Sequence, residues 1–336
     1  MSDRDRDVAA RLAAVVQRHL GPGEVRALTR LTGGATKITW SFDAVVGGQT
    51  LPLILQQTPP ERLRVAAERS GPSIHGAQEA ALLGAAARAG VPAPRVRIVL
   101  DLDDGLGEGT VTERVAGETL ARKINTDPAL AAVRPQLAAQ CGHVLAAIHR
   151  IDATGLDFLV PQTAREQLAA YRQLADAYDH PLPALEHGLR WVAEHLPRAP
   201  RTSVVHGDFR NGNLIIGDDG IRCVLDWELA QIGDPMQDLG WLCVKTWRFG
   251  GPLPVGGFGH RDDLFRAYEQ SGGGTVDPTH VRFWEAFGCV KWALMCVQKG
   301  LGDLQGSRRS VEAVAIGRRI EEPLLDFLDL ITGKQP

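Results

Sequence analysis

The spacing of hydrophobic residues over the first third of the chain predicts a small antiparallel sheet packed with helices. Residues 5–20 place hydrophobic side chains at helical spacing and end at a Gly-Pro-Gly breaker, so we expect an amphipathic helix there. Gly-Gly turns separate short apolar or alternating runs that are typical of an antiparallel meander. The predicted strands cover 25–32, 37–46, 50–56, 95–101 and 109–115, and a second helix covers 74–89.

Helical spacing dominates the rest of the chain. The helices that it predicts cover 129–149, 163–178, 184–196, 261–270, 280–299 and 308–330. The exception is 203–226, where short β-rich runs bounded by Asn-Gly and Asp-Asp-Gly turns predict a β-hairpin. We therefore expect an α+β chain of two lobes: a β-rich N-lobe over 1–113, with a five-stranded sheet and helices, and a mostly helical C-lobe over 114–336.

Composition narrows the class of protein. The 336 residues include 37 basic and 40 acidic ones, so the net charge of -3 gives no general attraction to nucleic acid or to a membrane. No uncharged apolar stretch reaches the roughly 18 residues that span a bilayer, and the first residues are highly charged, so we expect a cytoplasmic protein. The five cysteines form no CxxC pair and lie in apolar surroundings, which indicates reduced core thiols.

Three polar residues of the 203–226 hairpin are placed to hold a cation. Asp208 and Asn213 lie five residues apart on one turn, and Asp226 follows thirteen residues later at the end of the next strand. Magnesium prefers oxygen ligands of this kind and takes substrate phosphates as further ligands. A carboxylate close by, such as Asp208, can accept the proton of a hydroxyl that attacks phosphorus. This spacing is the one found in kinases.

The segments around this hairpin resemble a known family. Two consecutive segments are similar to the aminoglycoside phosphotransferase and choline kinase family of small-molecule kinases: VVHGDFRNGNLII and, after it, VLDWELAQIGDPMQDLGWL. Three flanking segments resemble the branch of this family that in animals is fused to acyl-CoA dehydrogenases: LTGGATKITWSF, GVPAP and TERVAGETL. The resemblance covers about residues 25–330 and implies a bilobal protein-kinase-like fold. It also implies transfer of the γ-phosphoryl group of Mg²⁺-bound ATP, with GTP as the alternative donor, to a small-molecule hydroxyl.

The resemblance assigns roles to five residues of the catalytic segment. It makes Asp208 the catalytic base and makes Asn213 and Asp226 the Mg²⁺ ligands. His206 is expected to brace the catalytic turn, and Asp238 to support it through backbone hydrogen bonds. A single Asp before a turn is more often a helix or turn cap, so the joint spacing carries these assignments.

The nucleotide side rests on weaker motifs. Gly33 and Gly34 form a turn between predicted strands, where backbone N–H groups can approach phosphates. Glu79 falls on the helix where the family has a glutamate that pairs with a strand lysine or arginine; the alternative is a solvated helix face. Glu113 and Val115 lie at the predicted lobe junction, where the family holds adenine through main-chain groups.

Three positions decide which cations contact the phosphates. Gln56 stands where the family has the strand lysine or arginine, and its neutral side chain puts activity in doubt because phosphoryl transfer depends on such charges. Lys37, at the start of the second strand, could replace the missing cation, as in one branch of the protein kinases; the alternative is an exposed strand lysine. Arg210 either neutralises the transferred phosphate or is a solvated loop arginine.

The expected acceptor side favours an anion over an antibiotic. Residues 245–319 hold eleven basic and seven acidic residues, whereas polycationic aminoglycosides call for a carboxylate-lined cleft. Several aromatic residues lie in or next to this segment, so we expect an anionic small-molecule hydroxyl acceptor with an apolar portion, such as a hydroxyacyl-CoA or a hydroxy acid. The alternatives are an aminoglycoside kinase, a pseudokinase or nucleotide-binding regulatory module, and, more remotely, a metal-dependent hydrolase.

Overall fold

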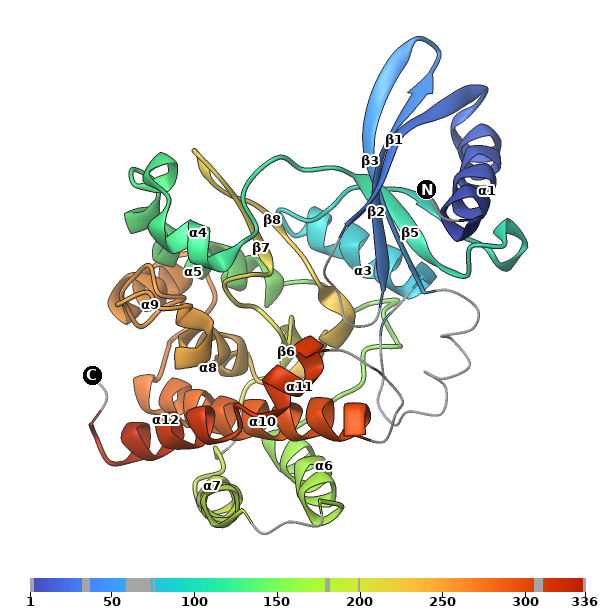
Figure 1. Cartoon of the computed structure of the whole chain (residues 1–336). Coiled ribbons are helices and arrows are strands. Elements are labelled where there is room, and N and C mark those ends of the chain that lie inside the picture. Colours follow the sequence, from blue (N-terminus) through green and yellow to red (C-terminus); the bar gives the residue numbers. More distant parts are fainter. Residues whose placement is uncertain are drawn as a thin grey trace. The chain divides into compact units, whose positions relative to one another are not determined.

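The computed structural model describes residues 3–31, 37–58, 74, 76–178, 182–198, 200–304 and 311–334. The chain divides into two compact units. Unit 1 comprises Met1–Gly117, Asp152–Phe158 and Arg222–Leu229, and unit 2 comprises Glu118–Ile151, Leu159–Ile221 and Ala230–Pro336. Figure 1 labels most of their α-helices and strands.

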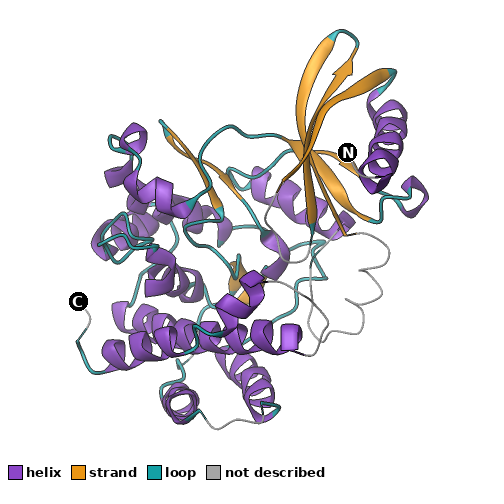
Figure 2. Ribbon diagram, in the orientation of Figure 1, coloured by secondary structure: helices purple, strands orange, loops and turns teal. Residues whose placement is uncertain are grey.

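Unit 1 is built on the five-stranded antiparallel sheet that the sequence predicts. The strands are β1 (Gly23–Leu31), β2 (Ile38–Val46), β3 (Gln49–Thr58), β4 (Val96–Val99) and β5 (Glu108–Glu113), in the spatial order β1-β2-β3-β5-β4. Helix α1 (Asp3–Leu20) packs against β1, and α3 (Gly76–Arg88) packs against β4 and β5 (Figures 1 and 2). The described residues of this unit also form two short 3-10 helices, η1 (Leu102–Asp104) and η4 (Trp227–Leu229).

Alternation along β2 and β3 separates the two faces of this sheet. Trp40 and Phe42 of β2 and Leu53 and Leu55 of β3 are buried in the hydrophobic core that also holds one face of α1. Because successive side chains of a strand point to opposite faces, Gln56 of β3 lies on the other face. The sheet thus keeps a second face on which polar residues of both strands can meet.

Unit 2 is mostly helical, as expected. Its α-helices are α4 (Ala121–Thr126), α5 (Leu137–Ile148), α6 (Ala164–Asp176), α7 (Pro183–Glu194), α8 (Met236–Cys243), α9 (Arg261–Gln270), α10 (Pro278–Leu304), α11 (Val311–Gly317) and α12 (Glu321–Ile331). Three short 3-10 helices are η2 (Pro128–Leu130), η3 (Arg134–Gln136) and η5 (Lys245–Arg248). The long helix α10 packs against α8, α7, α6, α11 and α12 and forms the spine of the unit.

The predicted hairpin region forms two small sheets. Strand β6 (Ser203–Val205) pairs antiparallel with β9 (Gln231–Gly233), and β7 (Leu214–Gly217) pairs with β8 (Gly220–Val224). The turn between β6 and β7 contains Asp208 and Asn213. Pairing of β6 with β9 brings the start of α8, and with it Asp238, to the same turn.

Two predicted helices differ from the observed ones. The helix predicted over 129–149 begins at Leu137, because Pro128 and Pro135 lack the backbone N–H of a helix interior and lie in 3-10 turns instead. The helix predicted over 308–330 is interrupted: α11 ends at Gly317, and α12 begins at Glu321. The sequence pattern joined them because both present hydrophobic residues at the same spacing.

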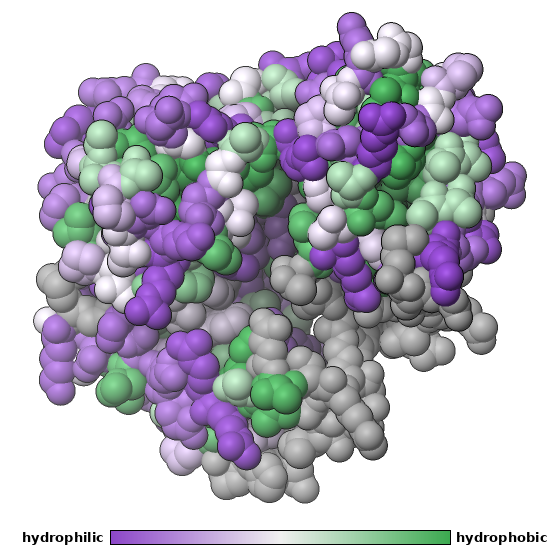
Figure 3. All heavy atoms as spheres, turned by 45° about the horizontal axis from the view of Figure 1, so that its top comes forward, coloured by the Kyte–Doolittle hydropathy of each residue, from purple (hydrophilic) through white to green (hydrophobic). Residues whose placement is uncertain are grey.

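All five cysteines are free and buried, as the sequence predicts. Within the described part of the chain, no helix is long and apolar enough to cross a membrane. On the face shown in Figure 3, hydrophobic residues occur in scattered groups among hydrophilic ones.

Candidate active site

Three side chains fix the carboxylate of Asp208, which lies in the turn after β6. The Oδ1 atom accepts a hydrogen bond from the indole Nε1 of Trp241 at 2.8 Å and one from Nε of Arg210 at 3.1 Å. The Oδ2 atom accepts from the Nδ2 amide of Asn213 at 2.7 Å. Trp241 is buried, whereas Asp208 keeps part of its surface open to solvent. The carboxylate is therefore oriented before any substrate binds.

Asn213 faces Asp208 with the amide nitrogen. Its Nδ2 atom donates both to the Asp208 carboxylate and, at 2.9 Å, to the Asp208 backbone oxygen. These two bonds set the orientation of the amide group, because only the nitrogen can donate. They leave the Oδ1 atom of Asn213 as the acceptor side, which is the atom that a magnesium ion would use.

Arg210 is packed into this site and is not a solvated loop arginine. Its guanidinium lies 4.5 Å from the centre of the Trp247 ring and pairs with the Asp208 carboxylate, and its side chain is 21% exposed. The positive charge is thus held beside the proposed base. Its role toward phosphate stays a prediction.

A buried hydrogen-bond network around Asp238 and His149 holds the backbone of the turn. The Asp238 carboxylate accepts hydrogen bonds from the backbone N–H of His206 at 2.7 Å and of Gly207 at 2.9 Å. His149 lies 3.1 Å from the same carboxylate through Nε2 and 2.8 Å from the Tyr268 hydroxyl through Nδ1. Burial alone would raise the pKa of Asp238, but the hydrogen bond and the charge of His149 outweigh it and hold that pKa below its ordinary value.

His206 is fully buried and accepts a hydrogen bond at its Nδ1 atom from the backbone N–H of Asp208. This bond joins His206 to the turn, and its role as a brace stays a prediction. The Asp234 carboxylate accepts a hydrogen bond from the backbone N–H of Met236 at the start of α8. The side-chain oxygen of Gln237, on the same helix, accepts a hydrogen bond from Gln167.

Asp226 lies in unit 1, at the end of β8, and has a left-handed backbone with φ of 66°. A non-glycine residue pays a conformational cost for this conformation, and such residues cluster at functional sites. Its side chain is exposed. Both features suit a carboxylate that is presented to a ligand.

Lys37 and Glu79 form a buried ion pair in unit 1. The Nζ atom lies 2.8 Å from both carboxylate oxygens, and the side chains are only 11% and 5% exposed. These values exclude both an exposed strand lysine and a solvated helix face. In the β2–β3 register Thr39 pairs with Gln56. Lys37 lies two residues before Thr39 and therefore on the same sheet face, which makes it the diagonal neighbour of Gln56.

The other predicted nucleotide residues have less specific surroundings. The Glu113 carboxylate pairs with Arg97 at 2.5 Å, and its backbone N–H donates to Arg95. Val115 is half-buried after the end of β5. Gly33 and Gly34 lie outside the described residues.

Sequence reasoning missed two residues that contact the turn. Trp241 follows Asp238 by three positions on α8, so the helical repeat places both side chains on one face and could have revealed the pair. Lys291 of α10 donates to the Gly207 oxygen at 3.1 Å and lies 4.3 Å from the centre of the Trp241 ring. No local motif marks it, because it reaches the turn only through the packing of α10 on α8.

Comparison with known proteins agrees with this geometry. The model of the APH phosphotransferase enzyme family matches residues 28–279. Acyl-CoA dehydrogenase family member 10 of Mus musculus is 34% identical over 213 residues, which is 59% of this chain and 20% of that protein. Family member 11 of Gallus gallus is 33% identical over 105 residues, 29% of this chain and 14% of that protein. The chain thus spans about a fifth or less of these relatives.

Solved structures share the fold across nearly the whole chain. A Ralstonia eutropha protein provisionally assigned as an aminoglycoside phosphotransferase has a TM-score of 0.71 at 22% identity, covering 96% of this chain and 98% of that one. A choline/ethanolamine kinase family protein of Mesorhizobium loti has a TM-score of 0.62 at 22% identity, covering 97% and 94%. Aminoglycoside phosphotransferase APH(4)-Ia, solved with AMP-PNP and hygromycin B, has a TM-score of 0.58 at 17% identity, covering 94% and 98%.

The fold is therefore the bilobal α+β kinase-like fold that the sequence predicts. The family match extends over both the sheet of unit 1 and the turn of unit 2 that contains Asp208. The chain belongs to the APH phosphotransferase enzyme family.

Proposed function

We propose that this phosphotransferase moves the γ-phosphoryl group of ATP to a hydroxyl of a small hydroxy acid or hydroxyacyl compound, with Asp208 as the base. The observation that carries the proposal is the preoriented Asp208 carboxylate, fixed by Trp241, Arg210 and Asn213. In the reaction the acceptor oxygen forms a bond to the γ-phosphorus and its proton passes to Asp208, while the bond from that phosphorus to the β,γ-bridging oxygen breaks and ADP leaves.

The side-chain oxygens of Asn213 and Asp226 are of the kind that magnesium prefers as ligands. Asn213 offers an amide oxygen whose partner nitrogen is already held by Asp208, and Asp226 offers an exposed carboxylate. A bound magnesium ion would neutralise charge on the phosphates. The chain's own contribution is to orient the two ligands and to keep Asp208 ready to accept the proton.

The Lys37–Glu79 pair supports a cation site for the α- and β-phosphates despite Gln56. A lysine held by a buried glutamate is the arrangement that kinases use to position these phosphates, here with the lysine supplied by the neighbouring strand. Gly33 and Gly34 would supply backbone N–H groups, and main-chain groups at Glu113 and Val115 would hold the adenine. ATP is the proposed donor, in line with the AMP-PNP complex of APH(4)-Ia.

The proposed acceptor class rests on charge and on the relatives. The basic excess over residues 245–319 does not suit a polycation. The matched relatives are named as acyl-CoA dehydrogenase family members, which favours an acyl compound that carries a hydroxyl. Hygromycin B, bound in APH(4)-Ia, is the aminoglycoside against which this preference is tested.

The substitution Asp208→Asn tests the proposed chemistry. It keeps the size of the side chain and removes the proton acceptor, so kcat should fall by about 10²- to 10⁴-fold while the affinity for Mg²⁺-bound ATP is kept. ADP release is measured with straight-chain hydroxy acids, hydroxyacyl-CoA compounds and hygromycin B as acceptors. Asp157→Asn, at an exposed residue of unit 1, is the matched control. Equal turnover by the wild type and the Asp208 variant would refute the assignment of the base.

A wild type that binds ATP and turns over no acceptor would instead support a pseudokinase. A wild type that uses only hygromycin B would support the aminoglycoside kinase.

A further inference from the structure

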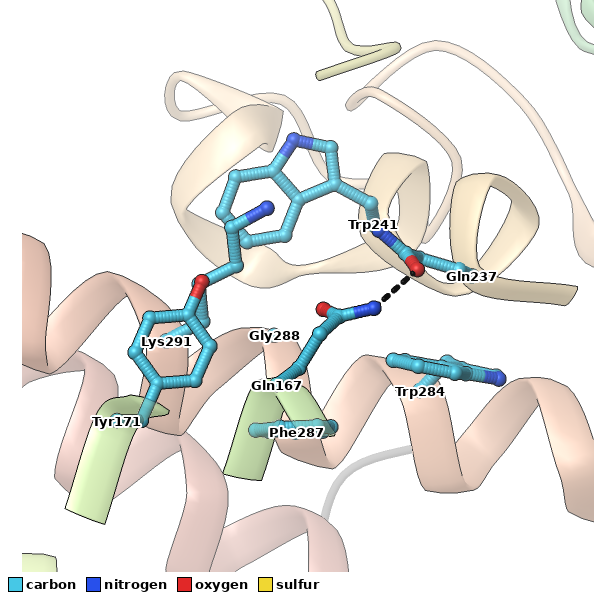
Figure 4. A pocket seen from close by; sticks show the side chains of 8 residues that line it. All are labelled: Gln167, Tyr171, Gln237, Trp241, Trp284, Phe287, Gly288 and Lys291. Atoms are coloured by element: carbon cyan, nitrogen blue, oxygen red, sulfur yellow. Dashed lines mark hydrogen bonds between the residues drawn. The ribbon is translucent and has the colours of Figure 1, made fainter. Parts of the chain in front are cut away.

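A narrow pocket of unit 2 lies directly beside the catalytic turn. Its walls come from α6, α8 and α10, and Figure 4 shows its lining residues: Gln167, Tyr171, Gln237, Trp241, Trp284, Phe287, Gly288 and Lys291. In this view the aromatic rings form most of the wall, and Tyr171 and Lys291 lie on one side of it. The pocket is thus an apolar space with one cationic group.

Lys291 is a half-buried residue whose ammonium group has no carboxylate partner among the described residues. Its ammonium group donates to the neutral Gly207 oxygen at 3.1 Å and lies over the Trp241 ring. Among the residues that the structure describes, no carboxylate lies within ion-pair distance of its Nζ atom. The residue keeps some exposed surface, but burial of the ammonium group lowers its pKa, and the charges of Asp208 and Asp238 compensate only in part.

Several other cations of the described residues pair with carboxylates, whereas Arg134 bonds to backbone oxygens. Lys37 pairs with Glu79, and Arg261 pairs with the buried Glu285 at 2.9 Å from both carboxylate oxygens. Lys245, although half-exposed, still has Asp326 as its partner at 2.7 Å. An unpaired buried charge costs free energy. A bound anion would supply the missing partner of Lys291 and remove this cost.

Resting on the proposed function, we propose that the Lys291 pocket binds the acid group of the acceptor and thereby directs the acceptor's hydroxyl to Asp208. The Lys291 ammonium has two N–H groups beyond the one given to Gly207, and the Tyr171 hydroxyl lines the same pocket as a second donor. Burial raises the pKa of Tyr171, which keeps this hydroxyl protonated.

Trp241 connects the acid group to the chemistry. One face of its ring contacts Lys291, and its Nε1 atom donates to the Asp208 carboxylate. An acceptor anchored at Lys291 therefore binds against the residue that orients the base. The pocket selects a free hydroxy acid over its CoA thioester, because the thioester carbonyl has no charge to pair with the ammonium group.

The test measures binding of acids without turnover. Straight-chain hydroxy acids of short, medium and long chain length, and their neutral methyl esters, are titrated into the full-length protein while tryptophan fluorescence is recorded. Lys291→Met should weaken binding of the best acid by about 10- to 100-fold, the value of a lost charge-assisted hydrogen bond, and should leave ester binding unchanged. Lys291→Arg should restore part of the affinity. Lys299→Met, on the same helix and 5.5 Å from the Trp292 ring centre, is the matched control.

Stability separates this role from a structural one. Because the unpaired ammonium group is disfavoured in the folded protein, Lys291→Met should not lower the Tm of the ligand-free protein. Titration of inorganic phosphate and ADP distinguishes the acceptor's acid group from a nucleotide phosphate.

Three results would overturn the proposal: equal binding of acids by wild type and Lys291→Met, weakened binding of ADP or phosphate in place of the acid, or binding of no acid by the wild type. Each leaves the role of Asp208 to be judged separately by the Asp208→Asn variant.

Discussion

The turn that contains Asp208 and the Lys37–Glu79 pair both hold charged side chains in fixed positions. They differ in how far apart their residues lie in the sequence. In the turn, Asp208, Arg210 and Asn213 lie within six consecutive residues, so a local sequence motif specifies the site. Lys37 and Glu79 lie 42 residues apart and meet only through the sheet and the packing of α3. In a site built by packing, such as the Lys37–Glu79 pair, a residue on a neighbouring strand can supply the same group. In a site built from one local motif, such as the turn around Asp208, it cannot.

The largest expected effect is the loss of stability when Asp238, which holds the backbone of the turn, is replaced. Asp238→Asn replaces a buried acceptor of two backbone N–H groups by an amide that cannot accept at both atoms, and it leaves His149 without its carboxylate. The free energy of unfolding should fall by about 3 kcal/mol or more. Chemical denaturation measures it, with Asp262→Asn, at the exposed start of α9, as control. A loss no greater than that of the control would contradict the role of Asp238.

The same variant gives a pH dependence. The pKa of Asp238 is lowered in the folded protein, so its contribution to stability is fully present above the ordinary value of 3.8 and is lost as the pH falls through the folded-state pKa below it. The wild type should therefore lose stability more steeply than Asp238→Asn as the pH falls below 3.8. Parallel pH profiles of the two proteins would count against this linkage.

The second effect tests whether the cation can change strands. Lys37→Met should lower kcat/KM for ATP by about 100-fold, as the loss of one preorganised donor does in other enzymes. Gln56→Lys, added to Lys37→Met, should restore part of this loss, because position 56 lies diagonally across from position 37 on the same face. Lys123→Met removes a surface pair with Glu118 and serves as control. An unchanged kcat/KM in Lys37→Met would exclude Lys37 from the phosphate site.

The smallest effect concerns the orientation of the base. Trp241→Phe keeps an aromatic ring and removes the Nε1 donor to Asp208, while Asn213 and Arg210 still hold the carboxylate. We expect kcat to fall by about tenfold, with the KM for ATP unchanged. A change in KM alone would indicate that Trp241 acts on the nucleotide and not on the base.

The sequence predicts contiguous features well. Strand alternation gives the five-stranded sheet, and the spacing of Asp208 and Asn213 gives a turn in which the two side chains meet. It fails where backbone chemistry competes with periodicity, as at Pro135, which shortens a predicted helix. It also fails where packing alone makes a contact: nothing near His149 or Lys291 in the sequence marks them as neighbours of the turn.

The most direct test of the central claim is a calorimetric titration of the wild type with ATP, with and without Mg²⁺, because it needs no knowledge of the acceptor. A working phosphotransferase whose Lys37 replaces the missing strand cation should bind ATP in a Mg²⁺-dependent manner, with a Kd in the micromolar to sub-millimolar range, about that of typical enzyme substrates. Absence of binding by both ATP and GTP would contradict the account and would favour a role outside phosphoryl transfer.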